Sequence, residues 1–417
     1  MKFELLTHRS ELRAQVEIIV HSTPVMDVHT HLFPTELSRF CLFGIDELLT
    51  YHYLTAETFR SARISHDRFW QLSKTAQADL VWKTLFVENS PISEASRGII
   101  SVLDAFGLDT RAADLEEARK FFHSRNLSQH VDQVFDIANL SAVVMTNDPL
   151  DDEEARIWES EIQLDHHFRS SMRLDRLLND WHKAAGALSH QGVSVNPDVD
   201  DATITRLRLF LEKWIERMHP VYMGVSLPAD FQFPAADTRD RLLREVVLPT
   251  AREHGLGVTL MIGVRRRVNP DLREAGDGIG KADVSAIERL SAAYPEIKFL
   301  VTFLSRENQH ELCVAARKFS NLMPFGCWWF LNNPSIVSEI TRERLELLGP
   351  SFIPQHSDAR VLEQLIYKWK HARKEIADAL YDSYEQLLNS GRAVTPEEIS
   401  RDVGRMFSGN FYEWVGR

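Results

Sequence analysis

The stretch VMDVHTHLFP, residues 25–34, decides the fold class of this chain. Its mostly apolar start is typical of a buried β-strand, and His29 and His31 come directly after it. Side chains at i and i+2 of an extended chain lie on one face, so both imidazoles can point at one position. Imidazole nitrogens bind divalent metals at about 2.0–2.1 Å. Because α/β barrels carry their chemistry at the C-terminal ends of strands, the stretch predicts a metal-binding strand of such a barrel.

The two histidines alone do not establish a metal site, since a chain with 17 histidines contains such pairs by chance. Asp27 shares a strand face with them, which allows it to orient a ligand through a hydrogen bond. The alternative for Asp27 is a carboxylate at a strand end that backbone N–H groups satisfy. If a metal is bound, further ligands must come from other parts of the sequence.

Composition narrows the class of protein. The 417 residues, 44% of them hydrophobic, exceed the roughly 250 of a plain barrel, so an insertion or a small second domain is expected. A net charge of −12 disfavours nucleic-acid binding. Three cysteines without a CxxC spacing favour a reducing cytoplasm over a disulfide framework. The chain has neither a signal-type start nor a run of about 18 apolar residues, so no membrane association is expected. A cytoplasmic homo-oligomer is expected instead.

Short apolar segments alternate with amphipathic ones, which predicts β/α units around a parallel sheet. Eight strands are predicted, at residues 25–28, 141–146, 168–174, 222–227, 257–262, 298–304, 322–327 and 351–354. Helices are predicted at 203–218, 238–253, 284–293, 308–319, 334–347, 362–388 and 395–407. The fold class expected is α/β, a (β/α)8 TIM barrel made of residues 1–32 and 141–417. Residues 33–140 show more than one helix and no clear strand, which predicts a helical insertion subdomain over the barrel mouth.

A second stretch, FIPQHSDAR at residues 352–360, follows the last predicted strand. In a closed barrel that strand neighbours the first one, so Asp358 can reach the same metal as the two histidines. Two histidines and one carboxylate leave coordination positions open for water or substrate. The alternative for Asp358 is an N-cap of the next helix. Arg360 can bind a carboxylate ligand or lie on the surface.

These segments resemble the uronate isomerases, a branch of the amidohydrolase superfamily. The resemblance rests on DVHTHL (27–32), YHY (51–53), GCWWFLNNP (326–334) and SDAR (357–360), and it spans nearly the whole chain. It implies a (β/α)8 barrel that holds one divalent metal, often zinc. The implied reactions interconvert D-glucuronate with D-fructuronate and D-galacturonate with D-tagaturonate, so the implied partner is a hexuronate.

The resemblance also assigns roles to individual residues. His29, His31 and Asp358 match the metal ligands, and His52 with Tyr53 matches a pair of proton-transfer and substrate groups. Five residues fall at or near positions where the family has substrate-contacting side chains: Arg173, Asp230, Arg266, Trp328 and Arg360. The family's commoner form has a histidine within Leu-His-Ile-Gly, but here the segment is LMIG and Met261 cannot carry a proton. A divergent subgroup is therefore expected, with one metal, because the strand FLVTFL (299–304) also lacks a histidine.

Several of these residues also have a purely structural explanation. The YHY segment can be a helix face on the core, and Trp328 can be a core residue. Arg266 belongs to a run of three arginines that is ordinarily solvated, whereas Arg173 ends an apolar strand, where function is favoured.

The chemistry of an aldose–ketose isomerase needs a base, an acid for the carbonyl oxygen and fixed charge for the enediolate. The metal and Arg360 are expected to anchor the substrate carboxylate, and Tyr53, His52 or Asp358 is expected to move the proton. Two alternatives stay open at this stage. One is a metal-dependent hydrolase of a sugar-acid lactone, ester or amide, which usually needs ligands that the middle strands here lack. The other is a uronate-binding protein without turnover.

Overall fold

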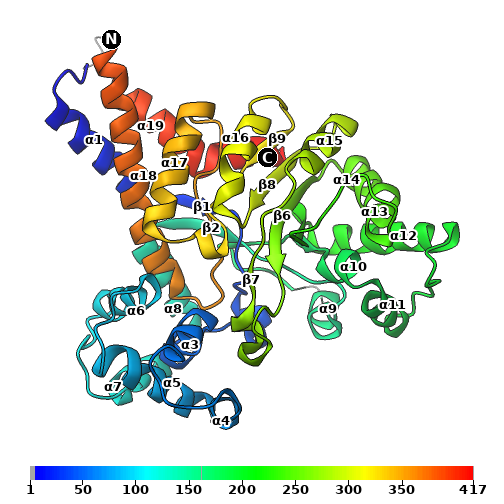
Figure 1. Ribbon diagram of the computed structural model, residues 1–417, viewed down its shortest axis with the longest axis horizontal. Coiled ribbons are helices and arrows are strands. Elements are labelled where there is room, and N and C mark those ends of the chain that lie inside the picture. Colours follow the sequence, from blue (N-terminus) through cyan, green and yellow to red (C-terminus); the bar gives the residue numbers. More distant parts are fainter. Residues whose placement is uncertain (1–4, 161, 417) are drawn as a thin grey trace.

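Short parallel strands with helices packed outside them organise the chain (Figure 1). A computed structural model describes residues 5–160 and 162–416. One sheet has the order β1 (Val25–Asp27), β2 (Leu140–Val144), β3 (Phe168–Arg169). The second has the order β4 (Met172–Arg173), β5 (Tyr222–Pro228), β6 (Gly257–Arg265), β8 (Phe299–Phe303), β9 (Leu322–Pro324), and β7 (Gly278–Ile279) pairs antiparallel with β6. The predicted α/β class with parallel sheets is confirmed.

The strands β6 and β8 of the second sheet are buried on both faces. Every residue of β8 is buried, as is every residue of β6 except its last. Parallel sheets covered on both faces consist of nearly continuous apolar runs, and the sequences GVTLMIGVR and FLVTF fit that rule. The continuous pattern explains why these two strands were predictable from the sequence.

Backbone hydrogen bonds beyond the end of β2 connect the first sheet to β4 of the second sheet. Asn147, three residues after β2, accepts a bond from the N–H of Arg173 (2.8 Å) and donates to the carbonyl of Ser171 (3.1 Å). The continuation of β2 therefore runs beside β4, and the two sheets meet at this junction.

Glu154 of α9 (Asp152–Glu159) forms hydrogen bonds with residues at this junction. Its carboxylate accepts hydrogen bonds from the Asn147 side chain (2.7 Å), the Asp148 N–H (3.0 Å) and the Trp158 indole (3.2 Å). Burial nevertheless raises the pKa of Glu154 from 4.5 to about 7. The buried carboxyl of Glu154 thus holds the side chain of Asn147, the residue whose backbone bonds join the two sheets.

The raised pKa of Glu154 predicts a pH-dependent contribution to stability. Between pH 4.5 and 7 the folded protein binds more protons at Glu154 than the unfolded chain, so this contribution is lost as pH rises through that window. Relative to Glu154→Gln, the free energy of unfolding of the unmodified protein should fall by up to about 1.4 kcal/mol per pH unit. Urea unfolding of both proteins across the window measures this, and parallel stability curves would contradict it.

An early and a late segment of the chain also pair with each other through backbone hydrogen bonds. The N–H of His31 donates to the carbonyl of Ala359 (2.7 Å), and the N–H of Asp358 donates to the carbonyl of His29 (3.1 Å). Residues that follow the first predicted strand therefore lie beside residues that follow the last one. This pairing is what the sequence led us to expect.

Two predicted strands are wrong in detail. The segment 168–174 is divided into β3 and β4, which lie in different sheets, and between them the Ser171 hydroxyl bonds to the carbonyl of Met145 (2.6 Å). The segment 351–354 forms no named strand, since within it only Ile353 pairs, with Phe325, as an isolated bridge. Serine side chains compete with backbone pairing, and Pro354 has no N–H to donate, which accounts for both differences.

The predicted outer helices are present, with ends shifted by a few residues. They are α12 (Asp201–Met218), α13 to α14 (Thr238–Leu242 to Leu248–Glu253), α15 (Ser285–Ala293), α16 (Gln309–Ala316), α17 (Pro334–Leu348), α18 (Gln364–Asn389) and α19 (Pro396–Gly404). In α12 the buried side chains include Leu207, Leu211, Trp214 and Met218, the spacing of one helix face. The Asp200 side chain caps its first turn by accepting from Thr203 N–H (2.8 Å).

Helices fill the chain between β1 and β2. They are α2 (Ile45–Leu49), α3 (His52–Thr58), α4 (His66–Gln71), α5 (Lys74–Trp82), α6 (Glu94–Ala105), α7 (Glu116–His123) and α8 (Leu127–Ala138). Figure 1 shows α3 to α7 grouped at one end, away from the helices α12 to α15. A fully buried pair, His130 with Glu363 (2.7 Å), ties α8 to the segment just before α18. None of the described helices combines the length and apolarity needed to cross a membrane.

Candidate active site

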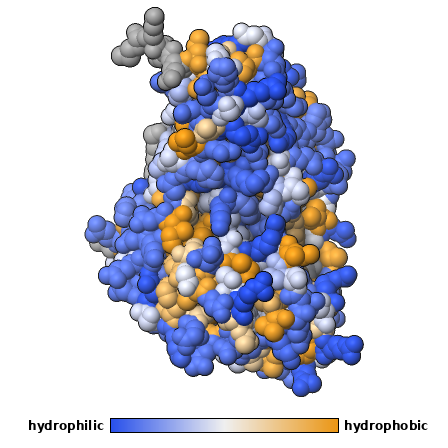
Figure 2. Space-filling view, turned by 90° about the vertical axis from the view of Figure 1, so that its left-hand side faces the viewer, coloured by the Kyte–Doolittle hydropathy of each residue, from blue (hydrophilic) through white to orange (hydrophobic). Residues whose placement is uncertain are grey.

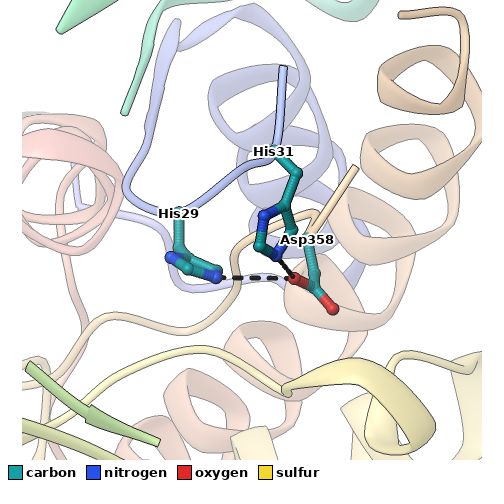
Figure 3. A group of neighbouring side chains, drawn as sticks. All are labelled: His29, His31 and Asp358. Carbon is teal, nitrogen blue, oxygen red and sulfur yellow. Dashed lines mark ion pairs between the residues drawn. The ribbon is translucent and has the colours of Figure 1, made fainter. Parts of the chain in front are cut away.

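Three side chains converge where the residues that follow β1 meet the residues that precede α18 (Figure 3). Nε2 of His29 lies 3.5 Å from Oδ1 of Asp358, and Nε2 of His31 lies 3.4 Å from the same oxygen. His29 and Asp358 are buried, and His31 is partly buried. The three groups thus come together as the sequence predicted, although two of them lie more than 300 residues from the third.

The spacing of these atoms fits a divalent metal. Ligands at about 2.0–2.1 Å from a tetrahedral ion lie about 3.4 Å from one another. The measured separations of 3.4 and 3.5 Å agree with that value. Both Nε2 of His29 and Oδ1 of Asp358 are buried without a hydrogen-bond partner among the described residues, so each keeps a lone pair for an ion.

Tyr222 shows which nitrogen of His29 carries the proton. The Tyr222 hydroxyl donates to the carbonyl of Val28 (2.9 Å) and lies 3.4 Å from Nδ1 of His29. A hydroxyl has one proton, so toward His29 it accepts, and Nδ1 is the protonated nitrogen. Nε2 therefore faces the carboxylate of Asp358 with a bare lone pair. Two acceptors at that distance call for a cation between them, which is the second argument for a metal.

The charge states of two of the ligands, His31 and Asp358, agree with metal binding. Burial lowers the pKa of His31 to about 3, which keeps this imidazole neutral. The pKa of the Asp358 carboxyl lies well below its usual value although burial favours the protonated acid, so Asp358 is ionised. Neutral imidazoles and an ionised carboxylate are the forms that bind a metal.

The contacts of Asp27 support the second explanation given for it, a carboxylate that backbone N–H groups satisfy. Its carboxylate accepts from the backbone N–H of Ser357 (3.1 and 3.2 Å), from His29 N–H (3.4 Å) and from the Trp369 indole (2.8 Å). It is a strand-end carboxylate satisfied mainly by backbone donors, and these bonds reach the main chain, not the imidazole, of His29. The same bonds connect the two segments that carry His29 and Asp358, so Asp27 sets their spacing.

The backbone at Asp358 is in an uncommon conformation. Its φ is +52°, in the left-handed region that non-glycine residues rarely adopt. The N–H bond to His29 and the neighbouring bond from Ala359 N–H to the Ser357 hydroxyl (3.2 Å) hold it there. Such strain is typical of functional positions, where surrounding contacts maintain it.

His356 is a neighbour of the site that the sequence did not single out. Its ring contacts the ring of His29 edge-on (centroids 5.2 Å), and both ring nitrogens are buried without a partner among the described residues. A Cβ on Gly326 would lie 1.9 Å from this ring, which explains the glycine of the GCWW block. The available signal was its position, two residues before Asp358.

His52 and Tyr53 begin α3 and form a second group near the ligands. Nε2 of His52 accepts a hydrogen bond from the Trp329 indole (3.1 Å), and burial lowers the pKa of His52 to about 3. The Tyr53 hydroxyl is buried without a partner among the described residues. Burial raises the pKa of Tyr53 well above 10, and the charge of Asp358 acts in the same direction. Tyr53 is thus a protonated phenol beside the ligand group.

Arg360 lies in the wall of a cavity of about 420 Å³ together with Tyr51, His52 and Trp70. Its guanidinium Nη1 lies 3.4 Å from a carboxylate oxygen of Glu274, whose side chain is 83% exposed. Glu274 belongs to η4 (Pro270–Gly276), which contacts α3 and α4. The volume is within the range of about 300–1,000 Å³ of small-molecule sites.

Arg173 and Arg266, both expected near the substrate, have acidic partners in the structure. Arg173 is partly buried at the end of β4, and its Nε lies 3.1 Å from Asp175. The side chain of Arg266 is 59% exposed and lies 2.6 Å from Asp277. No described contact joins Arg266 to the ligand group. Its exposed environment is that of a solvated arginine run, and its role in substrate binding stays a prediction.

No described hydrogen bond or ion pair joins Asp230 or Trp328 to the ligand group, and their substrate roles stay predictions. Asp230 is exposed in the loop after β5. Trp328 is 3% exposed and belongs to an apolar cluster that includes Met261, Leu304 and Phe325. Met261 thus fills space in the same apolar cluster as Trp328, which gives a packing reason for methionine at this position.

Comparison with solved structures identifies the relatives of this fold. A uronate isomerase from Bacillus halodurans is 51% identical, over 98% of this chain and 97% of that chain, with a TM-score of 0.96. A uronate isomerase from Thermotoga maritima (14% identity, 99% and 98% covered, TM-score 0.77) and a glucuronate isomerase from Caulobacter crescentus (14%, 99% and 95%, 0.74) share the fold. No family model and no curated protein matched the chain. With a relative more than half identical over nearly its whole length, this protein belongs to the uronate isomerase family.

Proposed function

We propose that this protein is a metal-dependent aldose–ketose isomerase of hexuronates. The reactions are D-glucuronate to D-fructuronate and D-galacturonate to D-tagaturonate. One observation carries the proposal: the buried group His29, His31 and Asp358 is intact in a chain half identical to a uronate isomerase. Tyr53 and Arg360 nearby supply an acid and a cation for the substrate.

The reaction moves two hydrogens and adds no atom. A base removes the proton from C2 of the open-chain aldose, and the electrons shift to O1, giving an enediolate. O1 takes up a proton, O2 loses one, and C1 receives a proton to give the ketose. The site must therefore hold the substrate rigidly, stabilise charge on O1 and O2, and exchange protons at two adjacent carbons.

The charge states separate the three candidates for proton transfer. Asp358 is ionised, so we assign it as the acceptor of the C2 proton, and its second oxygen points away from both imidazoles (Figure 3). Tyr53 keeps its proton and is assigned as the acid that meets an enediolate oxygen. One divalent ion, zinc in our proposal, held by His29, His31 and Asp358, supplies fixed positive charge to substrate oxygens.

Arg360 is assigned to the substrate carboxylate. A guanidinium binds a carboxylate through two parallel hydrogen bonds, and Arg360 lines the cavity with His52. Arg173, Arg266, Trp328 and Asp230 are proposed as further substrate contacts on family resemblance, with the environments described above.

Glu274 competes with the substrate for Arg360 in this scheme. Glu274→Gln removes the competing carboxylate and its repulsion of the substrate, so KM for a hexuronate is expected to fall about two- to fivefold, the range of a surface ion pair. The value of kcat should change little. Glu339→Gln, which breaks an exposed ion pair between Glu339 of α17 and Arg306, is the matched control. Steady-state kinetics at low salt measures the effect, and an unchanged or higher KM would contradict it.

The finer architecture belongs to the same proposal. We infer a closed eight-stranded (β/α)8 barrel, supported by the bonds between Asn147 and Arg173 and between His31 and Ala359. Residues 33–140 are inferred to form a helical subdomain over its mouth.

A cytoplasmic homo-oligomer is also proposed. Figure 2 shows hydrophobic side chains in the lower half of one face, and Val87 and Ile92 between α5 and α6 are exposed.

A hydrolase of a sugar-acid lactone, ester or amide is the less favoured function. The strands β6 (GVTLMIGVR) and β8 (FLVTF) contain no His, Asp or Lys that could hold a second metal or a base. The deciding experiment is metal analysis of the purified protein combined with an assay on D-glucuronate and D-galacturonate. Ketose formation that is lost on chelation supports the isomerase. Saturable uronate binding without conversion in the metal-loaded protein would overturn it.

A further inference from the structure

The hydrogen bond between Trp329 and His52 determines more than packing. The indole Nε1 of Trp329 lies 3.1 Å from Nε2 of His52, and an indole N–H can only donate. The imidazole nitrogen that receives it must therefore be unprotonated. In the neutral ring the proton then sits on Nδ1. The two partners are 277 positions apart in the sequence, so this bond forms only in the folded chain.

We propose that Trp329 is a positioning residue that fixes His52 in the Nδ1–H tautomer, so that His52 offers the substrate a hydrogen-bond donor and not a base. The inference rests on the proposed function only for the identity of the substrate. The tautomer itself follows from the bond between the two side chains and needs no ligand.

The surroundings of both rings hold this geometry. The backbone φ of Trp329 is +48°, a left-handed conformation that is uncommon for a large side chain, and its indole stacks on Phe330 (centroids 4.7 Å, 14° between planes). The ring of His52 contacts the rings of Tyr51 (4.0 Å) and Tyr53 (4.4 Å). The indole is therefore aimed, and the imidazole is confined between two aromatic neighbours.

The alternative protonation states of His52 conflict with these contacts. Both the Nε2–H tautomer and the imidazolium would place an N–H against the indole N–H. Positive charge near His52 comes from Arg360 and Lys368, and together with burial it keeps the pKa of this imidazole near 3, whereas Asp358 acts in the opposite direction. His52 is neutral at working pH, with its one proton on Nδ1.

This tautomer assigns a role to His52 in the reaction. Nε2 is occupied by the indole, which leaves Nδ1–H as the ring atom available to a ligand in the cavity that His52 lines. A neutral N–H donor stabilises charge that develops on a substrate oxygen without transferring its proton. His52 then leaves the list of groups that remove the C2 proton, and Asp358 remains as the acceptor.

The direct test is ¹⁵N NMR of the protein with labelled histidine, recorded without substrate. The His52 signals are assigned by their loss in His52→Gln. We expect a protonated, pyrrole-type Nδ1 and a bare, pyridine-type Nε2. In Trp329→Phe the preference should weaken or reverse, whereas Trp328→Phe, a matched change of an indole 6.0 Å away, should leave it intact. A protonated Nε2 in the unmodified protein would overturn the proposal.

A second test uses activity and stays decisive if Trp329→Phe does not fold. An asparagine amide places its N–H₂ near the position of Nδ1, and a glutamine amide near that of Nε2. His52→Asn is therefore expected to retain a kcat at least about tenfold above that of His52→Gln, the scale of one donor to developing charge. Equal values, or a better His52→Gln, would overturn the donor role. Absence of any isomerase activity in the unmodified protein would instead count against the proposed function, and the NMR result would still decide the tautomer.

Discussion

Replacing Asp358 by Asn is expected to remove both the bound metal and the isomerase activity. The carboxylate oxygen lies 3.4 and 3.5 Å from two imidazole nitrogens, and the amide has no charge to balance a divalent ion there. It also removes the proposed acceptor of the C2 proton. Because one change affects both roles, kcat/KM should fall by about 10³-fold or more.

The measurements for Asp358→Asn are metal content by elemental analysis and steady-state kinetics on both hexuronates. Asp378→Asn is the matched control, since Asp378 forms surface ion pairs with Arg13 and Lys374 on α18. The control should keep its metal and its kcat/KM. A variant at 358 that retains a full equivalent of metal and activity within tenfold would refute the ligand and base assignments together.

Replacing Tyr53 by Phe should lower kcat by about 10²- to 10⁴-fold, the usual contribution of a general acid. The hydroxyl is buried without a partner among the described residues, and the raised pKa of Tyr53 keeps it protonated. Its loss leaves the developing charge on the enediolate without a donor. Metal content should stay unchanged, because the ligands do not include Tyr53.

Two readouts distinguish this result from a loss of folding. The rate of exchange of the C2 proton with solvent deuterium should fall together with kcat, because the enediolate no longer forms readily. Tyr381→Phe, which removes a hydroxyl bonded to Glu385 (2.7 Å) on α18, controls for loss of a phenol elsewhere. Full-rate C2 exchange in Tyr53→Phe would remove Tyr53 from the proton-transfer groups.

Much of the metal group could be predicted because its signals are local. The period of a strand places His29 and His31 on one face, and the apolar runs of β6 and β8 mark buried parallel strands. The rule that the first and last strands of a barrel are neighbours then brings Asp358 to them. Breaks within strands were harder to predict. The division of 168–174 depends on the bond from the Ser171 hydroxyl to the carbonyl of Met145, which forms only in the folded chain.

The α/β class, most of the strands and outer helices, and the three residues that can hold a metal follow from local sequence patterns. The bonds from backbone N–H groups to Asp27, from Tyr222 to the Val28 carbonyl and from the Trp329 indole to His52 became known only from the folded arrangement of the chain. The physical reason is that periodicity fixes the face on which a side chain lies, whereas hydrogen-bond partners hundreds of residues apart are chosen only when packing brings them within about 3 Å.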